Sequence, residues 1–477
     1  MSATTWQLLV GALHVALASI VSAHVVLTKS DVRAAIGWTG LVWLTPILGS
    51  FLYFFLGINR IRRAAGRMRS VRHLHTADRL AARAGNEVAR VDLPAPLARL
   101  ATLTGRISGE PLTEGNTVEP LVDGDAGYPA MLEAIGSART SIALATYIFD
   151  RGRVASRFVE ALAAAVARGV EVRVLVDGVG ANYSRPSILR TLRERGIAVA
   201  AFLPSPVPFA HPYFNMRNHR KLLIVDGRIG FTGGLNIRDG CVLVDRPLHA
   251  TRDLHFRLTG PVVGHLSEAF AFDWRFTTGE VLRGDRWFPP LEATGGVIAR
   301  GIPDGPDETQ DAYLMTLLGA LAEARDRVVI VTPYFLPDAG LLEALRVTVL
   351  RGVQVRLLTP ARGNLRLVQW AQQAVLSRAL ARGVRVELTP EPFDHSKLLV
   401  VDGAWALIGS ANWDPRSLRL NFEFQVECYS AELAGMLEKL VEAKAAGARV
   451  LGRHELDRRG LWPRLRDGAA WLLQPYL

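Results

Sequence analysis

Two segments of this 477-residue chain carry the same five residues at the same spacing. Each segment has a histidine, a lysine two positions later, and then an aspartate, a glycine and an asparagine. The first copy comprises His219, Lys221, Asp226, Gly233 and Asn236, and the second comprises His395, Lys397, Asp402, Gly409 and Asn412. Every residue of the second copy lies 176 positions after its counterpart. Such a sparse pattern, repeated in register, indicates a duplicated functional unit.

The residue types in these copies suit phosphate chemistry. An imidazole can act as a nucleophile or carry a proton, and an ammonium and an amide can hold phosphate oxygens. Residues two apart on a strand face the same side, so each histidine and its lysine are expected to point into one site. Two copies facing each other would place imidazoles on opposite sides of one phosphorus, as in-line displacement requires. A histidine alone would more simply be a core or surface residue, and the duplication is what favours catalysis.

Each copy also has the pattern of a β-hairpin. The apolar runs on either side of Asp226-Gly227 and Asp402-Gly403 predict strands, and Asp-Gly favours the tight turn in which both residues have positive φ. Asp226 and Asp402 therefore have two interpretations, which the sequence leaves open. As motif members they belong to the candidate catalytic set, and as turn residues they would hold structure.

The rest of the chain from about residue 111 alternates between strand and helix patterns. Residues 141–149 and 170–177 predict strands around a helix at 158–168, and the same order recurs at 328–334, 340–350 and 353–358. This pattern predicts an α/β fold with two βαβ repeats and mixed sheets, which together form one bilobal catalytic unit. We expect repeat 1 at residues 111–290 and repeat 2 at 291–450, with the boundary in a Gly- and Pro-rich stretch.

The N-terminal region predicts a membrane anchor. Residues 1–28 contain no Lys, Arg, Asp or Glu, and a second uncharged span covers 34–59. We therefore expect two transmembrane helices within residues 1–59, followed by a basic juxtamembrane linker at 60–110. The arginines that begin this linker place it in the cytoplasm by the positive-inside rule. A cleaved signal peptide is the alternative, but the first span lacks a positive n-region and a second span follows at once.

Composition narrows the class of partner and chemistry. Lysine and arginine exceed aspartate and glutamate by 11, which favours an anionic partner, either nucleic acid or an acidic membrane. The basic tail at 451–477 fits a membrane-surface helix and a helix packed on the domain equally well. The chain has only Cys241 and Cys428, and it lacks P-loop, H-E-x-x-H and C-x-x-C motifs. We therefore expect neither a metal nor another cofactor.

With these features in view, the chain is identified as a member of the phospholipase D superfamily, whose paired histidine-lysine-aspartate motifs it matches. It resembles the bacterial cardiolipin synthases over most of its length. Further matching segments are TYIFDRG around Tyr147, RDLHFRLTGPVV around Asp253 and RSLRLNFE around Glu423. One departure is Gly234, where many members carry serine, whereas the second copy keeps Ser410. A backbone amide or Lys221 is expected to serve in its place.

The resemblance implies a role for each residue. His219 attacks phosphorus to give a phosphohistidine, while His395 protonates the leaving alcohol and then activates the incoming hydroxyl. Lys221 and Lys397 complete the catalytic set, and Asp253 and Glu423 orient the histidines. The implied substrate-binding residues are Asn236, Asn412, Ser410, Gly233 and Gly409. Arg217, Tyr147 and Tyr334 are further candidates for the lining of the site.

The resemblance also implies a reaction. One phosphatidylglycerol donates its phosphatidyl group to a second, giving cardiolipin and glycerol, at the bacterial inner membrane and without nucleic acid. The alternatives are a phospholipase D hydrolase, in which water is the acceptor, a nuclease, and an inactive lipid-binding scaffold. The membrane spans disfavour the nuclease, and the two intact His-Lys pairs disfavour the scaffold. The sequence leaves the oligomeric state open.

Overall fold

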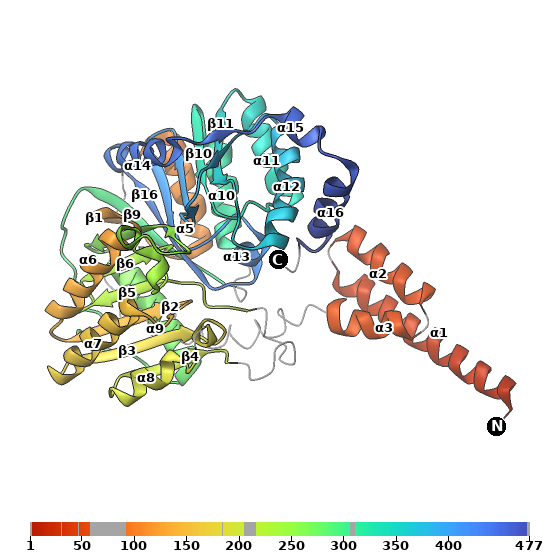
Figure 1. Ribbon diagram of the computed structural model, residues 1–477, viewed down its shortest axis with the longest axis horizontal. Coiled ribbons are helices and arrows are strands. Elements are labelled where there is room, and N and C mark those ends of the chain that lie inside the picture. Colours follow the sequence, from red (N-terminus) through yellow and green to blue (C-terminus); the bar gives the residue numbers. More distant parts are fainter. Residues whose placement is uncertain are drawn as a thin grey trace. The chain divides into compact units, whose positions relative to one another are not determined.

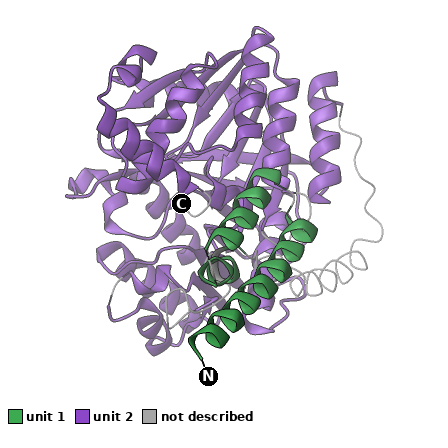
Figure 2. Cartoon of the chain, turned by 90° about the vertical axis from the view of Figure 1, so that its right-hand side faces the viewer, with its two compact units in different colours: residues 1–64 green, residues 65–477 purple. Residues whose placement is uncertain are grey.

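A computed structural model describes residues 2–29, 31–45, 47–57, 92–183, 185–204, 216–305 and 311–474. The chain divides into two compact units, residues 1–64 and 65–477, which are coloured separately in Figure 2. The arginine run expected to start the linker, from Arg60 to Arg72, lies outside the described residues, and so do residues 475–477 of the tail.

The first unit contains one helix of membrane-spanning length. Helix α1 (Ala3–Thr28) has 26 residues, so it is about 39 Å long and exceeds the roughly 30 Å of a bilayer core. Among the described residues it is the one helix long and apolar enough to cross a membrane.

The second apolar segment differs from the single helix expected over 34–59. It consists of α2 (Val32–Leu44), α3 (Leu48–Leu52) and a π-helical turn η1 (Tyr53–Gly57). Thr45, which precedes Pro46 in the sequence, is extended with φ −120° and ψ 98°. A residue before proline avoids the helical conformation, because its backbone would meet the proline ring. This local effect ends α2 at Leu44 and leaves a shorter apolar helix beside α1.

The second unit begins with α5 (Ala95–Ser108), followed by two series of strands and helices that are shown in Figure 1. The first series is β1 (Thr113–Val122), α6 (Asp123–Ser137), β2 (Ser141–Thr146), α7 (Arg153–Ala167), β3 (Glu171–Asp177), η2 (Gly180–Asn182), α8 (Ile188–Glu194), β4 (Ala198–Phe202), β5 (Leu222–Val225), β6 (Ile229–Gly233), η3 (Asp239–Cys241), η4 (Leu243–Asp245), β7 (Thr251–Arg252), β8 (Leu254–Thr259) and α9 (Val263–Thr278).

The second series repeats this order with small differences. It is β9 (Val297–Asp304), α10 (Ala312–Glu323), β10 (Arg327–Val331), α11 (Ala339–Leu350), β11 (Gln354–Pro360), α12 (Arg366–Leu380), β12 (Arg385–Thr389), β13 (Phe393–Asp394), β14 (Leu398–Val401), β15 (Trp405–Gly409), α13 (Pro415–Arg419), β16 (Glu423–Tyr429), α14 (Ala431–Ala445), β17 (Arg449–Val450), α15 (Arg453–Asp457) and α16 (Leu461–Leu472).

All but two of these strands form one mixed sheet of 15 strands. Its order is β17-β12-β11-β10-β14-β15-β16-β9-β1-β8-β6-β5-β2-β3-β4. Read outward from the antiparallel β1–β9 contact, the two halves have the same strand order, which is the structural form of the duplication, and the second half adds β17 at its edge. In each half, three neighbouring strands are parallel, β2-β3-β4 in one and β10-β11-β12 in the other, and the motif hairpin is antiparallel. The predicted α/β class with mixed strands is confirmed, and the two halves share one continuous sheet.

Buried faces explain why the strands are so apolar. Every residue of β2 (SIALAT) is buried. Ile142 and Leu144 belong to the same core cluster as Phe158 and Leu162 of α7. Ala143, on the opposite face, lines a pocket with Phe270 of α9. A strand covered by helices on both faces reads as a continuous apolar run, and β2 therefore shows no alternation.

The two Asp-Gly turns have the predicted geometry. Asp226 and Gly227 have φ of 53° and 63°, and Asp402 and Gly403 have φ of 53° and 59°. The Asp226 carboxylate accepts the backbone N–H groups of residues 139, 140 and 141 at 2.7–3.0 Å. Asp402 accepts those of residues 325, 326 and 327 at 2.8–2.9 Å. Each aspartate thus ties its hairpin to the start of β2 or β10.

Part of the expected linker is a folded element of the second unit. Helix α5 lies within residues 60–110, and its Leu100 shares a core with Leu317 of α10. Pattern reading missed this because the partner of α5 lies more than 200 residues away in the sequence.

The aspartate turns yield a prediction. Replacing Asp402 with alanine leaves three backbone N–H groups without their acceptor, which we expect to lower the free energy of unfolding by roughly 2–4 kcal/mol. Asp402→Asn should lose less, because asparagine tolerates positive φ and keeps one oxygen acceptor. Thermal unfolding of the purified protein measures both. If Asp402→Ala abolishes turnover while the melting temperature is unchanged, the aspartate is catalytic and the structural interpretation is wrong.

Candidate active site

The two repeats exchange backbone contacts at their motifs. The N–H of His395 donates to the carbonyl of Arg252 at 2.8 Å, and the N–H of His219 donates to the carbonyl of Phe422 at 2.9 Å. The short strands β13 and β7 pair in parallel at the first of these contacts. The backbone of each histidine is therefore held by the other repeat. The accepting residues, Arg252 and Phe422, directly precede Asp253 and Glu423 in the sequence.

The histidine side chains make the same exchange. Nδ1 of His219 lies 3.0 and 3.1 Å from the two oxygens of Glu423, and Nδ1 of His395 lies 2.9 Å from Oδ2 of Asp253. Both carboxylates are buried. Asp253 and Glu423 were predicted to orient histidines without an assigned partner, and the structure pairs each with the histidine of the opposite repeat.

This pairing sets the chemistry of the imidazoles. A carboxylate only accepts hydrogen bonds, so Nδ1 carries the proton and Nε2 keeps its lone pair. Burial lowers the pKa of His219 to about 4, although Glu423 opposes the shift. Burial alone would raise the pKa of Glu423, but His219, Lys221 and Ser410 lower it to about 2. Burial and Lys397 likewise lower the pKa of His395. The free site thus holds neutral imidazoles, and the carboxylate beside His219 is charged.

The lysines lie at the same site. Nζ of Lys221 donates to the carbonyl of His219 at 2.7 Å, and Nζ of Lys397 donates to the carbonyl of His395. Burial lowers the pKa of Lys221 to about 7 and that of Lys397 to about 8. Each lysine also lowers the pKa of the other repeat's histidine, so the two motifs share one electrostatic environment.

The motif glycines make room for neighbouring side chains. Gly233 pairs with His255 across β6 and β8, and Gly409 pairs with Gln425 across β15 and β16. A Cβ at Gly233 would lie 2.8 Å from Nδ1 of His255, and one at Gly409 would lie 2.4 Å from Oε1 of Gln425. Their φ angles, 144° and 150°, also disfavour other residues. Substrate binding by these glycines stays a prediction, and in the structure their missing side chains leave room for His255 and Gln425.

Ser410 supports a carboxylate. Its hydroxyl donates to Oε2 of Glu423 at 2.5 Å and is fully buried. In the first repeat, a Cβ at Gly234 would lie 1.9 Å from Oδ1 of Asp253, so the shorter carboxylate occupies the space of the missing serine. The backbone N–H of Leu254 donates to that oxygen at 2.9 Å. In the first repeat, a backbone amide thus donates to the carboxylate, whereas in the second repeat a serine hydroxyl does so.

The remaining predicted residues divide into two groups. The rings of Tyr147 and Tyr334 lie edge-on to His219 and His395, with centroids 5.1 and 6.2 Å apart. Residues placed in other contacts are Asn236, whose Oδ1 accepts the Ile148 N–H, Asn412, whose Nδ2 donates to Asp414, and Arg217, which forms a buried ion pair with Asp177.

Asp226 and Asp402 are not brought to the histidines. Each lies in the turn at the far end of its motif hairpin, bonded to backbone amides. Their membership of the motif therefore reflects folding of the hairpin. His255 and Gln425 were not singled out from the sequence, yet both lie beside the motif glycines. The signal that could have found them is their common position, two residues after each orienting carboxylate.

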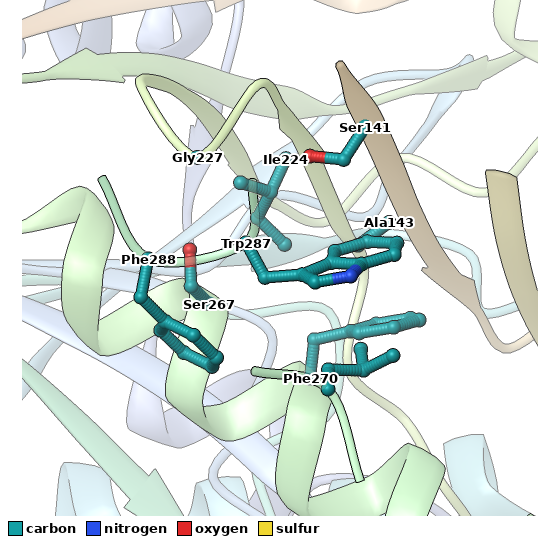
Figure 3. A pocket seen from close by; sticks show the side chains of 9 residues that line it. Ser141, Ala143, Ile224, Gly227, Ser267, Phe270, Trp287 and Phe288 are labelled. Atoms are coloured by element: carbon teal, nitrogen blue, oxygen red, sulfur yellow. The ribbon is translucent and has the colours of Figure 1, made fainter. Parts of the chain in front are cut away.

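Other chemistry has little support in the described part of the chain. No group of three or more His, Cys, Asp or Glu residues there could hold a metal ion. Cys241 and Cys428 are buried free thiols. A small apolar pocket lies between β2, β5 and α9, where Ile224 and Phe270 approach Trp287 (Figure 3). None of the motif residues lines it.

Paired α/β repeats with a carboxylate-oriented histidine from each define a phosphodiester transferase of phospholipase D type. Comparison with known proteins agrees. The model of the family "Cardiolipin synthase, PLD-like domain" matches residues 131–249 and 317–444, and that of "Phospholipase_D-nuclease N-terminal" matches residues 16–57. The crystal structure of phosphatidylserine synthase from Haemophilus influenzae has the same fold, with a TM-score of 0.61 and 14% identity over 79% of this chain and all of that one.

Full-length relatives refine the assignment. Cardiolipin synthase A of Pseudomonas fluorescens is 32% identical over 98% of both chains. Cardiolipin synthase of Oceanobacillus iheyensis is 29% identical over 99% of both, and that of Listeria monocytogenes is 32% identical over 77% of both. The chain therefore belongs to the cardiolipin synthase family of phospholipase D-type enzymes.

The lowered pKa values of the lysines predict how anion binding depends on pH. Their charged forms attract a phosphate group, and these forms are lost as pH rises through about 7 for Lys221 and about 8 for Lys397. Sulfate, which keeps its charge throughout, should bind best below pH 7 and roughly tenfold more weakly at pH 9. Calorimetric titration of the full chain measures this. Lys221→Met should remove the lower of the two transitions, and an affinity independent of pH would contradict the assignment.

Proposed function

We propose that this enzyme transfers the phosphatidyl group of one phosphatidylglycerol to a second, giving cardiolipin and glycerol. The observation that carries the proposal is the pair of imidazoles, each fixed by a carboxylate of the opposite repeat. Exchange of one phosphodiester for another needs no energy input, which fits a chain without a nucleotide-binding motif. Family membership supports the lipid substrate.

The first step forms a covalent intermediate. Nε2 of His219 attacks the phosphorus of the donor lipid, so a P–N bond forms as the P–O bond to glycerol breaks. His395 gives its proton to the departing glycerol oxygen. Because burial and Lys397 lower its pKa in the free site, His395 acquires this proton as the anionic phosphodiester binds beside it. Lys221 and Lys397 hold the non-bridging oxygens, together with the motif asparagines Asn236 and Asn412.

The second step reverses the first with a different alcohol. His395, now neutral, removes the proton from a glycerol hydroxyl of the second phosphatidylglycerol. That oxygen attacks phosphorus, the P–N bond breaks, and His219 returns to its starting form. If water entered instead, the product would be phosphatidic acid, which is the reaction of the hydrolase alternative.

The contacts favour His219 over His395 as the nucleophile. An imidazole bonded to phosphorus through Nε2 is positively charged, so its carboxylate partner must be anionic and well supported. Glu423 approaches His219 with both oxygens and receives the Ser410 hydroxyl. Asp253 contacts His395 through one oxygen and has no serine beside it. The carboxylate of Glu423 is therefore better placed to stabilise a positively charged imidazole at His219 than Asp253 is at His395.

We also propose the membrane setting. Helix α1 anchors the chain, and the apolar segment from α2 to η1 returns across the bilayer, which gives two passes. The arginines from Arg60 onward place the catalytic unit in the cytoplasm of a bacterial cell, at its inner membrane. The repeats occupy residues 111–290 and 291–450, with the β1–β9 contact at their junction.

A lipid-product assay tests the reaction. In mixed micelles of phosphatidylglycerol, the wild-type protein should form cardiolipin and glycerol in equal amounts, and His219→Ala and His395→Ala should each lower the rate at least about 10³-fold. Melting temperatures serve as the folding control. Phosphatidic acid without cardiolipin would contradict the transferase assignment, and full activity of either variant would contradict the two-histidine mechanism.

A further inference from the structure

The C-terminal helix α16 has two different faces. Ala470 and Asp467 are buried, and the ring of Trp471 lies 3.6 Å from the guanidinium of Arg378 on α12. This face packs on the domain, as Figure 1 shows for α16 beside α12. The outer face, defined by Leu461, Trp462, Leu465, Leu472 and Leu473, is apolar and between 44% and 80% exposed. An exposed apolar stripe of this size marks an interaction surface.

The charges around the outer face have one sign. Asp467 is the only acidic residue between 458 and 474, and it is buried between Arg459 and Arg466 at 2.6 and 2.8 Å. Arg458, Arg464 and Arg466 are exposed. An apolar stripe bordered by arginines, without an exposed carboxylate, matches the acyl boundary and anionic headgroups of a bilayer.

The end of α16 is also close to the catalytic rim, by which we mean Tyr334 and the residues next to it. Tyr334, which contacts His395, donates its hydroxyl to Asn364 at 2.7 Å, next to the start of α12. Nε2 of Gln474, at the end of α16, donates to the carbonyl of Leu336 at 2.7 Å. Leu365 and Leu367, at the start of α12, are also exposed. A bilayer lying against α16 would therefore lie beside the second motif.

We propose that the outer face of α16 lies in the headgroup region of an anionic bilayer, which brings the catalytic rim to the lipids it uses. The helix then acts as a second membrane contact besides the N-terminal anchor. Its packing on α12 fixes the orientation of the domain, because a helix held rigidly on one face transmits its docking to the body that carries it. The inference concerns membrane contact and does not depend on the roles of the histidines.

A fluorophore attached at position 462 tests this contact. The full chain with Trp462→Cys is labelled with an environment-sensitive dye and reconstituted into vesicles of phosphatidylglycerol and phosphatidylcholine, since Cys241 and Cys428 are buried. Leu350→Cys is the matched control, because Leu350 is 74% exposed and is the last residue of α11. The next strand, β11, begins where β10 begins, and Tyr334 follows the opposite end of β10. Leu350 therefore lies at the end of the sheet away from Tyr334.

We expect lipid-borne quenchers to quench the fluorescence of the dye at position 462, and aqueous cobalt not to quench it. At position 350, cobalt should quench the dye and the lipid-borne quenchers should not. Arg458→Gln with Arg464→Gln should reduce the shielding at 462, most strongly in phosphatidylglycerol vesicles. Equal access of cobalt to both positions would overturn the proposal. Shielding that persists in detergent and grows with protein concentration would overturn it in favour of a contact between two copies of the chain.

A separate observation concerns His255 and Gln425. Both side chains are buried, and within the described part of the chain neither nitrogen of His255 nor Nε2 of Gln425 has a hydrogen-bond partner. Gly233 lies in one row across the sheet with Lys221 on one side and His255 on the other. This follows from the register, in which Leu222 pairs with Thr232 and Gly233 pairs with His255. Gly409 has the same position between Lys397 and Gln425. The side chains of Lys397 and Gln425 both line one small cavity.

The geometry points to His255 and Gln425 as positioning residues for the two lysines. An unprotonated nitrogen of His255 can accept from Lys221 directly or through a bound water, and Nε2 of Gln425 can donate to a water that in turn accepts from Lys397. An unpaired buried polar group is costly, so a polar partner is expected there. Each motif glycine then has a physical role, since a side chain at its position would separate the lysine from the neighbouring polar group. This inference rests on the proposed phosphate-binding role of Lys221 and Lys397.

Two substitutions separate positioning from packing. His255→Gln installs the residue of the second repeat and should keep the sulfate affinity and the rate of cardiolipin formation within about threefold of wild type. His255→Leu removes the polar group, so the loss of sulfate affinity should shift to lower pH and the KM should rise about tenfold with an unchanged melting temperature. Phe256→Leu, on the other face of β8, is the packing control.

The outcome discriminates between this inference and the proposed function. A His255→Leu protein with wild-type KM and sulfate profile would overturn the positioning role while leaving the reaction intact. If neither wild type nor His255→Gln formed cardiolipin, but both bound sulfate alike and His255→Leu lost affinity at lower pH, the proposed reaction would fail and the positioning role would stand.

Discussion

The crossed contact between each histidine and the carboxylate of the other repeat is the interaction on which the rest of the site depends. Neither repeat can orient its own imidazole, since Glu423 serves His219 and Asp253 serves His395. The continuous sheet through β1 and β9 and the exchanged backbone bonds at Arg252 and Phe422 keep these partners in register. The site is therefore a property of the joined halves, and separating them would leave two buried carboxylates and two imidazoles without partners.

Burial gives these groups their reactivity. Two lysines, two imidazoles and two carboxylates share a poorly solvated space, where charges interact more strongly than in water. The pKa values of the lysines fall toward neutrality, and the imidazoles stay neutral until a substrate brings negative charge. An anionic phosphodiester bound beside the two lysines would favour their protonated forms, because its negative charge raises their pKa values.

The two repeats share an architecture but differ where it matters for chemistry. Ser410 and Glu423 in one half correspond to Gly234 and Asp253 in the other, and the shorter carboxylate fills the space that a serine would need. Gln425 likewise corresponds to His255. In the proposed two-step transfer, one histidine would carry phosphorus and the other would carry protons, so unequal surroundings would suit this reaction better than perfect symmetry.

The sequence by itself determined the features that depend on neighbouring residues. Spacing alone identified the motif, apolar runs predicted the strands, and Asp-Gly predicted the positive-φ turns, because these follow from local backbone preferences. Tertiary structure decided the rest. Which carboxylate faces which histidine, why α5 belongs to the second unit, how Asp226 and Asp402 act and why His255 lies beside Gly233 all depend on contacts between residues far apart in the chain. Local patterns carry no information about such partners, since only the folded sheet brings them together.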